Sequence, residues 1–252
     1  MEIELPEEVA ERVAGAERVV ALTGAGVSAE SGLATFRGEE GLWQRFRPEE
    51  LATPEAFAAD PETVWQWYGW RFGRVADAEP NAGHRALVRF AALFPSFILV
   101  TQNVDGLHQR AGSERVLELH GTALRARCTR CDYTEPMAAA LARSPAAPPA
   151  CACGGMLRPA VVWFGEPLPP TLAVAAEAAG AADLFVSAGT SAQVYPAAGL
   201  IEIAYRGGAC VIEVNPEATA FSRLAHLRVA APAGEALPAL AEAFARCRSG
   251  AR

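Results

Sequence analysis

The sequence contains no lysine, because all 22 basic residues among its 252 positions are arginine. Schiff-base enzymes and nucleotide hydrolases of the phosphate-loop type need the amine that lysine supplies, so both classes are excluded. Arginine-biased codon usage or a hot habitat is the simplest explanation of this bias. Basic residues are outnumbered by 29 acidic ones, and the formal charge of −7 argues against a dedicated binder of the nucleic acid backbone.

Long hydrophobic runs are also missing, although 51% of the residues are hydrophobic. No segment reaches the roughly 20 apolar residues that span a bilayer, and the first residues, MEIELPEEVAERV, lack the basic and apolar regions of a secretory signal. Six cysteines in such a chain indicate a reducing compartment, where clustered thiols are more often metal ligands than disulfides. We therefore expect a folded cytoplasmic protein with no membrane partner and no direct binding of nucleic acid.

Four short apolar runs recur along the chain, at 18–23, 97–101, 184–187 and 210–214. Helical stretches such as 6–15 and 170–181 separate them. This alternation predicts an α/β fold with a Rossmann-type, doubly wound parallel sheet. Small or polar residues follow each run (GAGVS, QNVDG, AGTS and NPE), and ligands of such sheets bind beyond the carboxyl ends of the strands. The four loops are therefore expected to line one cleft.

Two close pairs of cysteines interrupt this pattern, Cys128 with Cys131 and Cys151 with Cys153. Their spacing is typical of a ribbon-type site that holds one zinc ion through four thiolates, whereas an accidental grouping of buried thiols is the alternative. Because four thiolates leave zinc no open position, we expect a structural zinc site in a small inserted module. The C-x-C pair is tighter than the usual C-x-x-C and predicts slight strain there.

The segment GAGVSA follows the first apolar run and fits the dinucleotide fingerprint G-x-G-x-x-G/A. Such a loop suits the approach of backbone N–H groups to a diphosphate, although a tight strand-to-helix turn gives the same pattern. The segment that follows does not read as a second strand ending in the acidic residue of an ordinary dehydrogenase. The sequence thus favours nucleotide binding over hydride transfer.

Several polar residues are ambiguous when each is taken alone. His120 follows the run VLEL and is expected at a strand end, where a structural histidine is the more common interpretation. Asn103 and Asp105 are equally compatible with an ordinary turn. Tyr68 and Arg71 share a helix face at a spacing of three, which is typical of a core tyrosine beside a surface arginine.

Seven motifs occur in one order across nearly the whole chain: GAGVSAESG with TFRG, TQNVDGLH, the HG at His120, the paired cysteines, RPAVVWFGE, SAGTSAQVYP and EVNPE. This set resembles the sirtuins, the NAD-dependent protein lysine deacylases. The resemblance implies a single catalytic unit, with a Rossmann-type NAD-binding domain over approximately 1–32, 78–120 and 160–252. It also implies a zinc module over approximately 121–159 and, over approximately 33–77, a cofactor loop and helical cap that carries four of the five tryptophans.

The resemblance assigns the NAD site residue by residue. It places a diphosphate loop, a mobile loop that closes over the cofactor, a group at the nicotinamide and its ribose, and a group at the adenosine end. In this order the residues are Gly24, Ala25, Gly26, Val27 and Ser28; Phe36, Arg37 and Trp43; Gln102, Asn103, Val104 and Asp105; and Gly189, Thr190, Ser191, Asn215, Pro216, Glu217 and Ala233.

The family chemistry transfers the acyl group of an acylated lysine in a protein or peptide to ADP-ribose and releases nicotinamide, without a catalytic metal. By resemblance, His120 is the general base on a ribose hydroxyl, for which a neutral imidazole with a pKa near ~6.5 is suited. Asn103 positions the ribose or a water molecule. An edge formed by Val161, Val162, Trp163 and Phe164 pairs with the substrate backbone and surrounds the lysine stem.

Ala52, Tyr68 and Arg71 resemble the class III sirtuins, which act on negatively charged acyl groups. A small Ala52 widens the pocket, Arg71 meets a distal carboxylate with two parallel hydrogen bonds, and Tyr68 donates its O–H. Succinyl-, malonyl- or glutaryl-lysine fits this interpretation. Two alternatives are an NAD-dependent mono-ADP-ribosyltransferase, which activates the same glycosidic bond, and a noncatalytic zinc module, which the charge and the NAD motifs disfavour.

Overall fold

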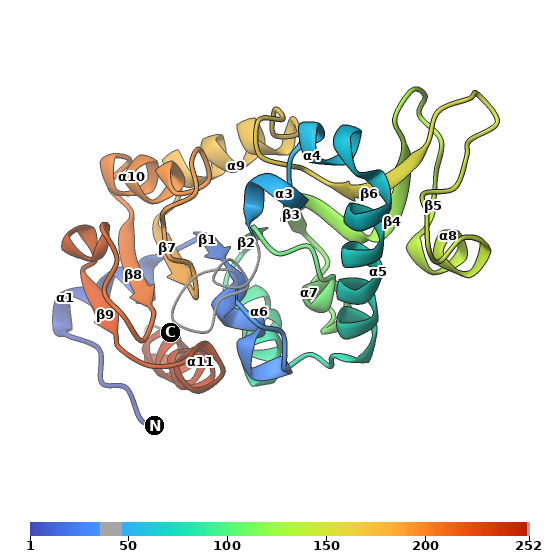
Figure 1. Cartoon of the computed structure of the whole chain (residues 1–252). Coiled ribbons are helices and arrows are strands. Elements are labelled where there is room, and N and C mark those ends of the chain that lie inside the picture. Colours follow the sequence, from blue (N-terminus) through green and yellow to red (C-terminus); the bar gives the residue numbers. More distant parts are fainter. Residues whose placement is uncertain (36–46, 251–252) are drawn as a thin grey trace.

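The computed structural model describes residues 1–35 and 47–250. In this part of the chain six parallel strands form one sheet in the order β3-β2-β1-β7-β8-β9 (Figure 1). The strands are β1 (Arg18–Thr23), β2 (Ser96–Thr101), β3 (Val116–Glu118), β7 (Leu184–Ala188), β8 (Cys210–Val214) and β9 (Leu227–Val229). The predicted doubly wound parallel sheet is confirmed, and each of the four predicted strands is within one residue of its observed bounds.

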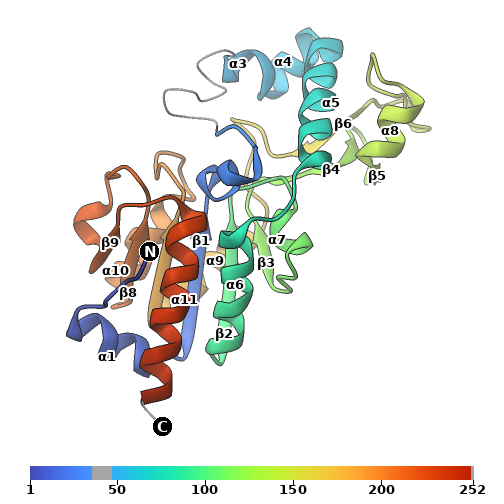
Figure 2. The same cartoon turned by 90° about the horizontal axis from the view of Figure 1, so that it is seen from below.

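Helices cover both faces of this sheet because its strands are apolar on both sides. One face packs against α1 (Glu7–Gly15), α6 (Ala82–Leu93) and α11 (Ala233–Gly250), which lie together in Figure 2. The other face packs against α9 (Thr171–Gly180) and α10 (Gly199–Arg206). Successive residues of β1 alternate between the two cores, with Val19 and Ala21 in the first and Val20 and Leu22 in the second.

A smaller antiparallel sheet lies to one side of the large one (Figure 1). Its strands pair in the order β5-β4-β6 and are β4 (Gly121–Cys128), β5 (Thr134–Pro136) and β6 (Leu157–Val161), with α8 (Met137–Arg143) packed beside them. Three further helices, α3 (Pro48–Leu51), α4 (Pro54–Ala59) and α5 (Pro61–Asp77), share a hydrophobic core with this sheet. The helical cap and the cysteine-bearing module are thus packed as one layer, while their predicted boundaries stay a prediction.

The strand order creates a switch point between β1 and β7, which are adjacent in space but distant in sequence. The chain winds from β1 toward β3 on one side and from β7 toward β9 on the other, so the connections that leave β1 and β7 lead to helices on opposite faces of the sheet. The remaining short elements are η1 (Ala25–Ser31), α7 (Leu107–Arg110) and η2 (Ser222–Leu224), and η1 and α7 follow strands at this edge.

Within residues 1–35 and 47–250, the structure contains no helix with the length and apolar character needed to cross a membrane. The predicted cytoplasmic location stays a prediction.

Candidate functional site

The loops after β1 and β7 contact each other so closely that they require glycine. A Cβ on Gly24 would lie 2.8 Å from the Gly189 carbonyl oxygen, and a Cβ on Gly26 would lie 2.8 Å from the Gly189 Cα. The Gly24 N–H donates to the Ala188 carbonyl at 3.1 Å, and the Gly26 N–H donates to the Gly189 carbonyl at 2.8 Å. These two N–H groups are therefore paired within the protein, and the glycines allow the close packing of the two loops, while the role of the loop at a diphosphate stays a prediction.

A cluster of buried polar side chains lies beside this loop. Ser28 Oγ donates to Asp105 Oδ2 at 2.8 Å and accepts from Asn103 Nδ2 at 3.1 Å. His84 Nε2 lies 3.4 Å from the same Ser28 oxygen, while His84 Nδ1 accepts from the backbone N–H of Asn81. The loops after β1 and β2 are thus joined through one serine hydroxyl, and the amide of Asn103 has a fixed orientation.

The loops after β2, β7 and β8 are joined in the same way. Gln102 Nε2 donates to Thr190 Oγ1 at 2.9 Å, and Asn215 Nδ2 donates to the Thr190 carbonyl at 2.7 Å. The structure therefore brings all four loops predicted from the sequence to one edge of the sheet. Such an edge, formed at a switch point, is where α/β folds bind nucleotides.

His120 connects this edge to the small sheet, because it lies between β3 and β4. Its Nδ1 is 3.1 Å from the Gln102 carbonyl oxygen, which can only accept a hydrogen bond. Nδ1 of the neutral ring must therefore carry the proton, which leaves the Nε2 lone pair free to take up a proton. Burial lowers the pKa of His120, so the ring is neutral at pH 7. These are the properties of a general base.

The glycine after His120 fixes the path of the chain at this point. Gly121 has a φ of +70°, and a Cβ there would lie 2.2 Å from the Ala160 carbonyl oxygen. Both the left-handed backbone and the close approach of β6 exclude other residues. The Val162 N–H then donates to the His120 carbonyl at 2.9 Å, which ties the predicted substrate edge to the histidine.

Two further histidines are buried behind the site, in α6 and α7. Their rings lie 4.9 Å apart between centroids, and His108 Nε2 is 2.9 Å from Thr23 Oγ1. Burial lowers the pKa of His84 to about 4 and that of His108 to about 3, with Asp105 opposing the effect at His84. Both rings are therefore neutral in the folded protein at pH 5, whereas they are protonated in the unfolded chain.

This difference predicts an acid-sensitive fold. Since the folded-state pKa values are depressed, the stabilisation is present above pH 6.5 and is lost as the pH falls toward 4. Between pH 7.5 and pH 5 we expect a loss of about 2 kcal/mol of unfolding free energy for each histidine. Urea denaturation at both pH values measures this loss in the unmodified protein and in His108→Gln. Between the two pH values, the unfolding free energy of the variant should fall by about 2 kcal/mol less. An equal loss in both proteins would contradict the assignment.

The residues predicted to select the acyl group lie together in the core shared by α3, α5 and β6. Tyr68 and Arg71 of α5 are 5% and 7% exposed. The alternative of a core tyrosine beside a surface arginine is therefore not observed. Ala52 is buried in the same core. Trp163 Nε1 donates to Tyr68 Oη at 2.9 Å. Burial raises the pKa of Tyr68 to about 12, so its hydroxyl keeps its proton.

The predicted substrate edge extends beyond the end of β6. Val161 belongs to the strand, whereas Val162, Trp163 and Phe164 follow it without strand pairing. Their N–H groups donate within the chain, to the carbonyls of His120 and Ala52 and to the Glu166 carboxylate. A peptide that adds to these three residues would therefore meet their carbonyl oxygens rather than their N–H groups.

The four predicted cysteine ligands converge at the end of the small sheet farthest from the large one. Their sulfur atoms all lie within 4.8 Å of one another, with Cys128 Sγ 3.4 Å from Cys153 Sγ and Cys131 Sγ 3.8 Å from Cys151 Sγ. These separations suit a tetrahedral set of thiolates around one ion at about 2.3 Å from each sulfur. The Arg130 N–H donates to Cys128 Sγ at 3.3 Å and lowers the pKa of that thiol, whereas the neighbouring thiols raise the pKa of Cys131 and of Cys151.

Not every predicted residue is placed in the site. Phe36, Arg37 and Trp43 lie outside the described residues. Pro216 and Glu217 are exposed after β8, and Ala233 is buried at the start of α11, where its carbonyl lies against Gly83.

Sequence reasoning did not assign His84 or Asn81 to the site. Asn81 caps α6 and donates to the Val27 carbonyl at 2.8 Å, so it anchors the loop after β1. The only signal for either residue is the Asn-x-x-His spacing of a helix cap, which by itself indicates no ligand site.

Comparison with known proteins gives one consistent result. The sequence profile described as "Sir2 family" matches residues 24–196. An NAD-dependent protein deacylase of Aquifex aeolicus is 53% identical over 83% of this chain and 87% of its own length, and one of Thermus thermophilus is 52% identical over 93% of each. A solved structure of a Sir2 homologue with NAD is 44% identical, with a TM-score of 0.86 over 100% of this chain and 97% of its own. A Sir2 complex with a p53 peptide and NAD⁺ is 30% identical, with a TM-score of 0.81 over 95% of this chain and 98% of its own.

Proposed function

Because the chain belongs to the Sir2 family, we propose that it removes acyl groups from protein lysine side chains and acts on succinyl- and malonyl-lysine in preference to acetyl-lysine. The chain is an enzyme of NAD-dependent protein deacylation, as its relatives at about 50% identity are. The single observation that carries the acyl preference is the burial of Tyr68 and Arg71 side by side in the core next to the substrate edge.

The carboxyl edge of the large sheet fits NAD. It offers the loop at Ser28, the amides of Gln102 and Asn103, and the loop joined through Thr190 and Asn215. When bound, NAD supplies a ribose–nicotinamide bond that can break and hydroxyl groups that can accept the acyl group. The chain itself contributes fixed donors and acceptors, whose orientation is set by hydrogen bonds between the loops.

His120 is the general base of this proposal. Its Nδ1–H is held by the Gln102 carbonyl, so Nε2 is available to remove a proton from a ribose hydroxyl. Asn103 Nδ2 donates a hydrogen bond to Ser28 Oγ, which keeps the Asn103 amide directed at the same edge. This orientation suits Asn103 to position the ribose or a water molecule. Zinc, held by Cys128, Cys131, Cys151 and Cys153, has a structural role because all four positions are protein thiolates.

Arg71 distinguishes acidic from neutral acyl groups in this proposal. Burial lowers the pKa of its guanidinium, but Asp105 and Tyr68 oppose this effect, and an arginine stays charged at neutral pH. A buried guanidinium binds a carboxylate with two parallel hydrogen bonds that an acetyl group does not offer. Ala52 in the same core has a small side chain, which suits a longer acyl chain.

Replacement of Arg71 by methionine tests the preference. We expect kcat/KM for a succinyl-lysine peptide to fall by a factor of about 100, since a hydrogen-bonded charge pair is lost, while the acetyl-lysine peptide of the same sequence loses far less. Mass spectrometry of free lysine peptide and O-acyl-ADP-ribose measures both, and it also separates deacylation from transfer of ADP-ribose to protein. Equal losses for the two peptides would reject the carboxylate-binding role of Arg71.

A further inference from the structure

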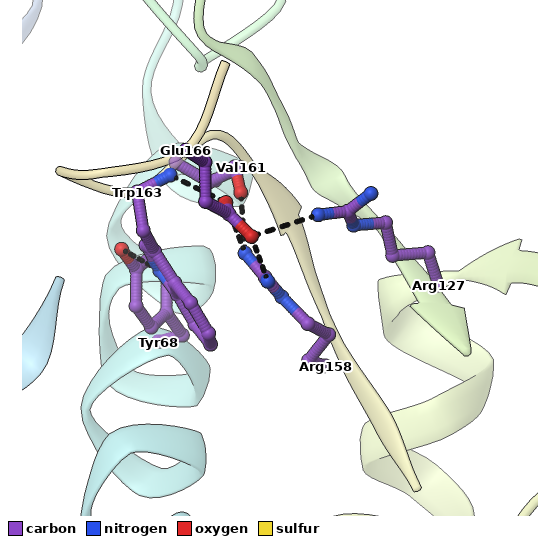
Figure 3. A network of polar contacts seen from close by, with 6 residues as sticks. All are labelled: Tyr68, Arg127, Arg158, Val161, Trp163 and Glu166. Carbon is purple, nitrogen blue, oxygen red and sulfur yellow. Dashed lines mark hydrogen bonds and ion pairs between the residues drawn. The ribbon is translucent and has the colours of Figure 1, made fainter. Parts of the chain in front are cut away.

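A second buried arginine, Arg158 of β6, is held beside the acyl-selecting residues, and its side chain is 7% exposed. Its guanidinium makes two hydrogen bonds to Glu166, Nη1 to Oε1 at 2.5 Å and Nη2 to Oε2 at 2.9 Å, and a third to the Val161 carbonyl at 2.9 Å (Figure 3). Arg127 approaches Glu166 from β4 at 3.3 Å. Neither charge of the Arg158–Glu166 pair is left uncompensated in the core.

This ion pair fixes Trp163 from two directions. Glu166 Oε2 accepts the Trp163 backbone N–H at 2.8 Å, and the Arg158 guanidinium carbon lies 3.3 Å from the centroid of the indole ring. Stacking of a guanidinium on an indole is favourable and defines the plane of the ring. Phe57 packs on the ring as well, with 5.3 Å between centroids. Trp163 is 2% exposed and has little freedom to rotate.

The position of the indole determines what Tyr68 can offer. Trp163 Nε1–H points at Tyr68 Oη in Figure 3 and donates to it at 2.9 Å. The phenol oxygen is therefore occupied as an acceptor. Among residues 1–35 and 47–250 no side chain or carbonyl accepts the Tyr68 hydroxyl hydrogen, so that hydrogen is left for a ligand.

We propose that the Arg158–Glu166 pair is a positioning element for acyl recognition: it holds Trp163 so that the indole N–H occupies Tyr68 Oη and leaves the hydroxyl hydrogen for the acyl carboxylate. This inference rests on the proposed preference for acidic acyl groups. Without the indole N–H, no contact within the described residues fixes the direction of the Tyr68 hydroxyl, and binding of the carboxylate must then orient it. Arg158, Glu166 and Trp163 thus act through Tyr68 and need no contact with the acyl group.

The test compares kcat and KM for succinyl- and acetyl-lysine peptides of one sequence. In Trp163→Phe and in Glu166→Gln, we expect the succinyl-to-acetyl ratio of kcat/KM to fall about 3- to 10-fold, mainly through KM for the succinyl peptide. Tyr68→Phe should lower the ratio at least as much. The double variant Trp163→Phe, Tyr68→Phe should show no further fall beyond Tyr68→Phe alone, because the indole acts through the hydroxyl.

The succinyl-to-acetyl ratio of kcat/KM separates this role from a loss of folded enzyme, because such a loss lowers the activity on both peptides equally. Glu135→Gln is the matched control, because Glu135 pairs with Arg143 in the same small module and its other hydrogen bond is to Tyr133. An unchanged ratio in Trp163→Phe or in Glu166→Gln, with a lowered ratio in Tyr68→Phe, would overturn the inference and leave the proposed function intact. If Arg71→Met also leaves the ratio unchanged, the proposed acyl preference is wrong, and this inference fails with it.

Discussion

Replacement of His120 by alanine is expected to reduce deacylation of acetyl-, succinyl- and malonyl-lysine peptides alike, by a factor of about 100 to 10,000. The loss is independent of the acyl group because the base acts on the ribose, which all three reactions share. Release of nicotinamide and formation of free lysine, both followed by mass spectrometry, measure it. His226→Gln is the control, since His226 contacts Arg12 and the Val211 N–H, away from the carboxyl edge of the sheet.

The pH dependence of the same reaction gives an independent check of the base. His120 works in its neutral form, and burial lowers its pKa below the usual value of 6.5. The rate constant kcat/KM should therefore fall on the acid side with a midpoint below pH 6.5, and the enzyme should be fully active at pH 7.5. Retained turnover in His120→Ala, or an acid limb centred well above pH 6.5, would show that a different group removes the proton.

Much of this site was predictable from the sequence because parallel sheets place the ends of their strands at one edge. The runs at β1, β2, β7 and β8 and the polar residues after them were sufficient to bring Ser28, Asn103, Thr190 and Asn215 together. The cysteine cluster was predictable for a related reason, since the spacing of two close pairs is set by the geometry of the ion.

Other features depended on contacts that no local pattern encodes. Gly24 and Gly26 lie against the loop after β7, which is more than 160 positions away in the chain. His84 was not assigned to the site, and its contact with Ser28 comes from the packing of α6 under the loop after β1. Arg158 and Glu166 form a pair only because the chain turns back sharply after Trp163.

Loss of zinc is expected to inactivate the enzyme even though the ion takes no part in the reaction. Cys128 ends β4, the strand that begins at Gly121 next to His120, and β4 pairs with β6, which leads into the substrate edge. A structural zinc site contributes about 10 kcal/mol or more of apparent binding free energy, which is comparable to the stability of a whole domain. Without zinc, the end of β4 at Cys128 is no longer held, and β4 then holds His120 and Val162 in place less firmly.

The experiment is to remove zinc with a strong chelator, and separately to replace Cys151 by serine, and then to measure metal content, thermal unfolding and deacylation. We expect about one zinc per chain before treatment, and in both treated forms a fall in zinc content, a lower unfolding temperature and loss of activity. Cys247→Ser is the matched control, since Cys247 lies outside the cluster and is partly exposed, so that serine replaces it at little cost. Full activity with an unchanged unfolding temperature in a zinc-free preparation would contradict the proposed structural role, because the small sheet would then hold His120 and the substrate edge in place through its hydrophobic core alone.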